Sequence, residues 1–577
     1  ISRRLGRLSG KSQSVLTTAA VIGREFDVDL AIEAGAGDED EMLDAVDEGV
    51  KASVLQSSGE RGGDRYQFTH RLLAEVLRTA ANPRRLKKIH ERVARAMEEL
   101  TPDAITEIAT HFDRAGEQAG ALRYALVAAE QARKVYAHNE ATEWLRIAER
   151  NATTPAELAD VRVRLATIAE AVGRYQEAEE LCHLAIDWFA GQGDRRQELA
   201  IRLMRERVRN LLGQPARQTL EACLVLDREM RELGAQADAD RVQLLRMLSM
   251  TYERLGDHLR GKEAAREGAE LAERVGDPYL KATALNRVGA TLLADDPMQA
   301  ADYHRRALEI YATMGDVRGQ AETHNNLGIV YTLRGDWEQA QGELRAAMQL
   351  ARTAGAPDLT GVLGLNLGVV YLKSGDYDRA RELFGEALAL FAAVRSSARQ
   401  LFALYNLAHL DRERGQLEAA AELYEITASL AQRVGHSDVE IGAMAGAGLA
   451  SLAKGQLDAA RVAWQASEER VKQRADWFQG RELVAALGVR VLAADGNASK
   501  ALDHFEQART LAEANDFYSA AWLALECAEA LLMHDPAQIR ATLDRYRERV
   551  KAAGYTELDR RYGEMLVRTE GQVVRSQ

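Results

Sequence analysis

Apolar positions recur at helical spacing over most of the chain after about residue 100, and the whole pattern repeats. One eight-residue motif returns every 40 residues as LRGDWEQA, KSGDYDRA, ERGQLEAA and AKGQLDAA, which begin at Leu333, Lys373, Glu413 and Ala453. A fixed period of this length is typical of helical-repeat proteins, whose units are helix pairs. We predict that residues 101–545 form a right-handed solenoid of about ten helix pairs. A terminal capping helix and tail are expected over residues 546–577.

Within each unit the pattern predicts two helices joined by a glycine turn. Leu327 and Tyr331 share one face of a first helix, and Gly335 ends that helix in a conformation with positive φ. The small Ala340 lets the second helix approach closely, and the larger Leu344 is expected to fill the gap to the next unit. Because one hairpin cannot bury both of its faces, neighbouring units must stack.

Residues 1–100 do not share this period. Helical patterns over SQSVLTTAAVIG, after REFDVDL and over GDEDEMLDAVDEGV precede two β-prone runs that flank a glycine-rich turn. This arrangement predicts a β-hairpin near residues 54–69, and further helices are expected from Arg71 and from about Pro83. Three helices followed by a hairpin is a winged-helix order, so we predict a small winged-helix domain over residues 1–100.

Composition and charge favour a helical protein that does not bind nucleic acid. The 577 residues include only 8 prolines and 10 phenylalanines. Of the net charge of −13, the first 100 residues carry −1, from 16 Lys and Arg against 17 Asp and Glu, which leaves −12 for the rest. Neither part has the basic surface that phosphate contacts require. The third helix, which would enter a DNA groove, is acidic from Asp38 to Glu48.

The sequence offers no motif for catalysis, a cofactor or a metal. GRLSGKS, from Gly6, has three residues between its glycines where a phosphate-binding loop has four. Cys182, Cys223 and Cys527 lie far apart, which supports neither a disulfide framework nor a zinc site. No apolar run approaches the roughly 20 residues that span a bilayer. We therefore expect no enzyme activity and no cofactor or metal in this chain, no membrane partner, and a cytoplasmic location.

The repeat resembles the tetratricopeptide repeat, with a period of 40 residues where that family has about 34, and without its closing proline. The longer period resembles the variant found in bacterial signalling ATPases. The residues that match the family's order are Leu367, Gly368, Tyr371, Gly375, Tyr377, Ala380, Phe384 and Ala387.

The first hundred residues resemble the winged-helix domain of STAND-type signalling ATPases, through AAVIGREFD, YQFTH and RRLKKIHERVARAME. The resemblance implies a P-loop nucleotide-binding module upstream in the same polypeptide, and the start at Ile1 leads us to expect a fragment of a larger protein. It also implies that His70 contacts the nucleotide phosphate in the full-length protein. The alternative is that His70 caps or packs against the next helix.

Four amides recur along the array, at Asn286, Asn326, Asn366 and Asn406. The resemblance implies that they line a concave face, where amides can bind a peptide backbone. Alternatively, they hydrogen-bond neighbouring helices. The predicted function is a sensing scaffold of a nucleotide-switched bacterial regulator, which binds a protein or peptide on that face. Two alternatives are a constitutive protein–protein adaptor and a small-molecule-sensing domain of a transcription regulator.

Overall fold

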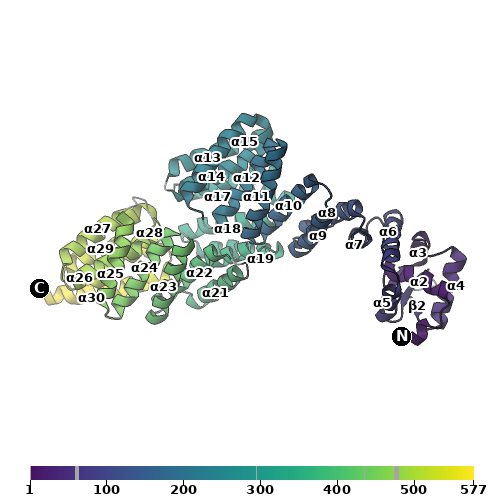
Figure 1. The fold of residues 1–577 in the computed structure, drawn as a ribbon. Helices are drawn as coiled ribbons and strands as arrows, with labels where there is room; N and C mark the ends of the chain where they lie inside the picture. The colour runs from purple at the N-terminus through teal and green to yellow at the C-terminus, as the bar shows by residue number, and fades with distance from the viewer. Residues whose placement is uncertain are drawn as a thin grey trace. The chain divides into compact units, whose positions relative to one another are not determined.

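The computed structural model confirms an all-α helical-repeat fold with one small sheet (Figure 1). It describes residues 2–58, 64–212, 214–255, 257–293, 295–394, 396–434, 436–472, 478 and 480–576. The chain divides into two compact units, residues 1–168 and 169–577.

The first unit combines short helices with a three-stranded antiparallel sheet in the order β1-β3-β2. The predicted hairpin is present as β2 and β3, while its expected glycine-rich turn at residues 59–63 lies outside the described residues. The elements are α1 (Ser2–Leu5), α2 (Gly10–Ile22), β1 (Glu25–Asp27), α3 (Val28–Glu33), α4 (Glu39–Lys51), β2 (Leu55–Ser57), β3 (Arg65–Phe68), α5 (Arg71–Ala80), α6 (Pro83–Leu100), α7 (Ile105–Ala115), α8 (Gln118–Lys134), α9 (His138–Asn151) and α10 (Pro155–Ala171), which crosses into the second unit.

Strand β1 was not predicted from the sequence. It pairs with β3 because Phe26 is buried against Phe68, with ring centroids 5.9 Å apart. The expected helix over the acidic segment is α4. Asp38 caps it by accepting a hydrogen bond from the Glu41 backbone N–H (2.9 Å), and acidic residues fill its first turn. Helices and hairpin thus follow the predicted order, and the winged-helix assignment remains a prediction.

The predicted domain boundary at residue 100 coincides with the end of α6, but the compact unit continues to residue 168. Helices α6 and α7 are joined by a buried histidine pair, His90 Nδ1 and His111 Nδ1, 2.9 Å apart. Burial, aided by nearby arginines, lowers the pKa of His90 to about 4. Burial and His90 lower the pKa of His111 to about 3. Near neutral pH both rings are therefore uncharged, and one donates its proton to the other.

The second unit is a succession of antiparallel helix pairs (Figure 1). Its elements are α11 (Tyr175–Gln192), α12 (Arg195–Leu212), α13 (Ala216–Leu233), η1 (Gly234–Ala237), α14 (Asp238–Arg254), α15 (His258–Val275), α16 (Pro278–Thr291), α17 (Pro297–Met314), α18 (Val317–Arg334), α19 (Trp337–Thr353), α20 (Pro357–Lys373), α21 (Tyr377–Ala393), α22 (Ser397–Glu413), α23 (Leu417–Val434), α24 (Ser437–Ala453), α25 (Leu457–Lys472), α26 (Arg481–Ala494), α27 (Ala498–Asn515), α28 (Phe517–Leu531), α29 (Pro536–Ala552) and α30 (Thr556–Ser576).

The 40-residue glycines end helices as predicted. Gly335, Gly375, Gly415 and Gly455 have φ values of 74°, 86°, 73° and 79°. In this left-handed region a side chain is strained, whereas glycine is not. After Gly335, the Asp336 N–H donates to the Tyr331 carbonyl (2.9 Å), which closes the turn before the next helix begins.

A second glycine in each regular unit admits a bulky side chain from the partner helix. A Cβ at Gly328 would lie 2.6 Å from Leu344 Cγ, and one at Gly368 would lie 2.5 Å from Phe384 Cε1. The glycine is therefore required by the size of the residue 16 positions later. Together with the fully buried Ala340, these contacts explain why the repeat alternates small and large positions.

The second unit is not a straight rod, since both of its ends contact its middle. Near the start, the Tyr175 hydroxyl donates to Asp358 Oδ2 (2.9 Å). Near the end, Trp337 Nε1 donates to the carbonyl of Ala553 (3.0 Å), 216 positions away. The segment predicted as a capping helix and tail, residues 546–577, comprises the end of α29 and α30.

Candidate partner-binding face

The four predicted amides are all partly buried on the first helices of successive pairs. Asn286 bridges three helices, because its Nδ2 donates to Thr323 Oγ1 (2.6 Å) and its Oδ1 accepts from His304 Nδ1 (2.9 Å). Helix α20 also uses its amide internally, since Asn366 Nδ2 donates to Asn325 Oδ1 (2.7 Å).

The other two amides differ from these. Asn406 Nδ2 donates to the Phe402 carbonyl of its own helix (2.8 Å). Asn326 makes no side-chain hydrogen bond to any residue that the structure describes. The structure therefore places the four residues at equivalent positions without giving them a common environment. Their role in binding a partner remains a prediction.

His70 is exposed and precedes α5. Its Nδ1 accepts a hydrogen bond from the Leu72 backbone N–H (3.2 Å), so it caps the helix. This agrees with the second of the two interpretations given above. The proposed contact with a nucleotide concerns a module that lies outside this chain and remains a prediction.

A cluster that the sequence did not indicate lies on the first helices of the early repeats. We call it the arginine–tyrosine cluster and define it as Glu170, Arg207, Arg246, Tyr279, Arg318 and Glu322, from α10, α12, α14, α16 and α18.

Two arginines of this cluster have carboxylate partners. Arg207 holds Glu170 through two N–H groups, with Nη2 2.7 Å from Oε2, and Arg318 Nε lies 3.1 Å from Glu322 Oε1. The side chains of Arg318 and Glu322 are 44% and 46% exposed, so this pair is worth little in stability. Arg207 is 33% exposed and its partner Glu170 only 16%.

The charges of this cluster shift the pKa values of Tyr279 and Arg318. Burial raises the pKa of Tyr279, and Glu322 adds to this rise, while the positive charges of Arg246 and Arg207 oppose it. Burial opposes the charge of Arg318, but Glu322 and, more weakly, Glu170 of α10 raise its pKa. Tyr279 is nevertheless 44% exposed.

This cluster was not predicted, because the units between residues 200 and 300 match the repeat motif poorly. Two weak repeat glycines, Gly213 and Gly256, lie outside the described residues. The available signal was an arginine near the middle of several first helices, at Arg207, Arg246 and Arg287. Their spacings of 39 and 41 residues are not strictly periodic.

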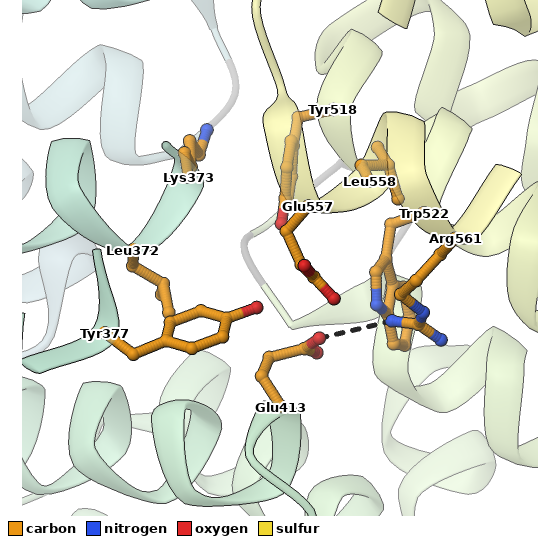
Figure 2. A pocket seen from close by; sticks show the side chains of 9 residues that line it. All are labelled: Leu372, Lys373, Tyr377, Glu413, Tyr518, Trp522, Glu557, Leu558 and Arg561. Carbon is orange, nitrogen blue, oxygen red and sulfur yellow. Dashed lines mark hydrogen bonds and ion pairs between the residues drawn. The ribbon is translucent and has the colours of Figure 1, made fainter. Parts of the chain in front are cut away.

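A second polar cluster lies where the last helices meet the middle of the array, and we call it the C-terminal seam (Figure 2). Figure 2 shows the carboxylates of Glu413 and Glu557 and the Tyr377 hydroxyl turned toward one small space. Arg561 Nη1 lies 3.2 Å from Glu413 Oε2. The residues that line the space are Leu372, Lys373, Tyr377, Glu413, Tyr518, Trp522, Glu557, Leu558 and Arg561.

The C-terminal seam is too small for an organic ligand. Its cavity measures about 10 Å³, which is room for about one water molecule. Its charges are also paired: Arg561 contacts Glu526 at 3.1 Å, and although burial opposes them, Arg490, Arg412 and Arg561 lower the pKa of Glu526 to about 2. The seam is therefore a packing contact between α30 and α22 and not a binding pocket.

Other chemistry is sparse in the part of the chain that the structure describes. No group of three or more His, Cys, Asp or Glu side chains there is placed to hold a metal ion. The three cysteines are buried, and burial raises each thiol pKa to about 12, so they are poor nucleophiles. Among the described helices, none is both long and apolar enough to cross a membrane.

Comparison with known families gives one match, over the most regular repeats. Residues 319–393 match the tetratricopeptide repeat family. This tetratricopeptide segment runs from α18 to the end of α21, where the paired glycines and bulky residues described above recur. Comparison with curated proteins finds no match to the sequence.

Solved tetratricopeptide structures are similar only at low identity. A STAND protein with a tetratricopeptide repeat sensor from Pyrococcus horikoshii has 13% identity and a TM-score of 0.39, covering 81% of this chain and 64% of its own length. A Rap protein complexed with competence and sporulation factor has 17% identity and a TM-score of 0.45, and the match covers 67% of this chain and 99% of the Rap protein. The apo form of the quorum sensor NprR from B. thuringiensis has 16% identity and a TM-score of 0.39, and the match covers 63% of this chain and 99% of NprR. The present chain thus spans less than two thirds of the STAND protein, and with these TM-scores no property of the relatives is transferred.

Proposed function

We propose that the second unit binds a protein or an extended peptide on the inner face of its first helices. The observation that carries this proposal is the arginine–tyrosine cluster, in which polar side chains from α10 to α18 converge and stay accessible. Arg207 and Arg318 are paired with carboxylates, but their side chains and Tyr279 keep access to water, as the side chains of a binding face must. The tetratricopeptide match fits a repeat scaffold of this kind.

We further propose that this scaffold is the sensing part of a nucleotide-switched bacterial regulator of the STAND class. In this view, an upstream P-loop module of the same polypeptide carries the nucleotide, residues 1–100 act as a winged helix between the two, and His70 reports the nucleotide state. The chain itself is then a cytoplasmic, non-enzymatic scaffold without a cofactor. A bound partner would act only by favouring one arrangement of sensor and switch over another.

The predicted amides allow a matched test. The Asn326 side chain makes no hydrogen bond to a described residue, whereas the Asn366 side chain donates to Asn325. If these amides bind the partner, Asn326→Ala should weaken its capture about two- to tenfold and leave the melting temperature unchanged, since a neutral hydrogen bond is worth about 0.5–1.5 kcal/mol. Asn366→Ala should lower the melting temperature, because it removes a bond between helices.

The experiment is a pull-down of the native partner by the chain, followed by affinity and melting measurements on both variants and on Tyr279→Ala. Val462→Ala, on the exposed side of α25, is the control. Capture that Tyr279→Ala and Asn326→Ala leave unchanged would contradict binding on the inner face. Stabilisation by a small molecule, with no protein captured, would favour a small-molecule sensor instead.

A further inference from the structure

The first helix pair of the second unit contacts helices that follow it by almost 200 residues. The Tyr175 hydroxyl of α11 donates to Asp358 Oδ2 of α20 (2.9 Å), and Arg399 Nε of α22 lies 2.8 Å from Asp358 Oδ1. Tyr175 and Asp358 are only 3% and 8% exposed. Beside them, a Cβ at Gly173 would lie 2.9 Å from Val394 Cβ, so the two turns touch. We call these five residues the α11–α22 clasp.

The clasp closes a circuit of helices. From α11 to α20, each helix contacts the next one in the sequence, and the clasp joins the last of them to the first. Helices α12, α14, α16 and α18, which carry most of the arginine–tyrosine cluster, lie within this circuit. A closed and an open clasp therefore differ in how far apart the two ends of the candidate binding face lie.

The contact is built so that little is lost when it opens. The ring of Tyr175 packs in an apolar cluster whose described members, among them Ala169, Ala178 and Val208, lie on α10, α11 and α12. The ring can thus stay buried in its own helix pair when the hydroxyl leaves Asp358. Arg399 remains beside Asp358, because α20 and α22 contact each other directly. Opening then breaks one hydrogen bond and leaves no buried charge unpaired.

The C-terminal seam has the opposite construction. One apolar core runs without a break from Leu401 on α22 to Leu566 on α30, and Trp337 packs against it. Lys373 Nζ also lies over the Tyr518 ring, 4.6 Å from its centre. Opening the seam would divide this core and expose apolar surface, which is costly. The two ends of the unit are therefore fastened to its middle in different ways, one by a core and one by a polar contact.

We propose that the α11–α22 clasp opens and closes in solution and controls access to the inner face, which a partner binds when the clasp is open. The role of the partner rests on the proposed function, whereas the opening itself does not. A hydrogen bond to a charged group changes an equilibrium constant roughly ten- to a hundredfold. A partner that binds the open form more tightly by this factor can offset the bond, and one without such a preference shifts nothing.

Distances between spin labels on the two sides of the clasp test the opening without any partner. Glu180→Cys on α11 and Ala389→Cys on α21 place the labels at exposed positions, and the buried native cysteines react poorly. Pulsed electron paramagnetic resonance should show a main short distance and a minor longer one. Tyr175→Phe keeps the buried ring and removes the donor, so it should raise the ratio of long to short distances about tenfold or more.

Two pairs of variants separate opening from a general loss of stability. Tyr311→Phe also removes a buried hydroxyl, which lies 2.8 Å from Thr283 Oγ1 on the neighbouring helix. It should lower the melting temperature and leave the label distances unchanged. Gly173→Ala presses on Val394 and should lengthen the distances. Gly193→Ala has a similar positive φ, 72° against 81°, but meets open space, so it should not lengthen them.

Unchanged distances in Tyr175→Phe, or equal lengthening in Tyr311→Phe, would overturn the clasp. If the clasp controls access, the partner captured in the pull-down should favour the long distance and bind Tyr175→Phe more tightly than the wild type. A partner that needs Tyr279 and Asn326 but leaves the distances unchanged would overturn the control of access and uphold binding on the inner face. Capture that is independent of Tyr279 and Asn326 would contradict the proposed function, while the distances in the free chain would still decide whether the clasp opens.

Discussion

The second unit contains two stretches that use the same helix pair differently. From α18 to α21 the first helix of each pair carries a glycine that receives Leu344 or Phe384, both almost fully buried. One unit earlier the corresponding residue is His304, packed against Gly289 and hydrogen-bonded to Asn286. The regular stretch is optimised for packing, and the irregular stretch keeps polar groups that packing alone does not require. The regular repeats are therefore where packing stabilises the array, and the irregular repeats are where candidate binding groups are found.

The largest effect should come from removing the packing of the regular stretch. Phe384 is fully buried against Gly368, so Phe384→Ala leaves a cavity and should lower the unfolding free energy by about 3–5 kcal/mol. Urea denaturation followed by circular dichroism measures the change. Val462→Ala, at a position 67% exposed, should stay within about 0.5 kcal/mol of the wild type. Equal changes in unfolding free energy for Phe384→Ala and Val462→Ala would show that the packing of the regular stretch does not stabilise the array.

The stability of the helix pair that contains His304 is expected to depend on pH. Burial, together with the charge of Arg287, lowers the pKa of His304 from 6.5 to about 4. Between these values the unfolded chain binds more protons than the folded one, so this contribution to stability is complete above pH 6.5 and is lost as the pH falls toward 4.

The variant His304→Leu introduces the side chain found at position 344. Its melting temperature should therefore depend less on pH over this range than that of the wild type. A weaker dependence will persist, because burial also lowers the pKa of His90 and His409 to about 4 and that of His111 to about 3. Identical pH profiles for the variant and the wild type would show that His304 is charged in the folded state or does not titrate with unfolding.

Two smaller changes in unfolding free energy, opposite in sign to each other, are expected when two glycines of one helix pair are replaced by alanine. Gly375 has a φ of 86°, so Gly375→Ala should destabilise by about 1 kcal/mol. Gly385 lies within α21 with open space around it, and Gly385→Ala should stabilise by about 0.5–1 kcal/mol. Thermal denaturation of the two variants gives the comparison. A loss of stability at both would indicate that the turn glycine has no special role.

The sequence predicted what depends on local periodicity. The 40-residue motif located the glycine turns at Gly335 and Gly375, and the change of pattern before residue 100 located the hairpin strands. Strand β1 was not predicted, because a strand of three residues is too short to show a periodic pattern. It is held against β3 by the buried Phe26.

The long-range contacts and the cluster could not be predicted in this way. The contact between Trp337 and Ala553 depends on the accumulated curvature of many helix pairs, which a single repeat does not encode. Likewise, Arg207, Arg246 and Tyr279 lie on three first helices at spacings that follow no strict period, so the motif did not indicate them. The amides were found at their predicted spacing, but their differing hydrogen bonds follow from neighbours such as Thr323 and Asn325.

The contact of the α29–α30 connection with the start of α19 has a consequence for how the array comes apart. In an open solenoid the terminal repeats touch one neighbour each, so they fray first and unzip the rest in sequence. Here Trp337 and Arg561 tie the last helices to the α18–α22 segment. Helices α29 and α30 must therefore detach laterally from the middle before they can unravel, because their connection contacts a residue 216 positions earlier.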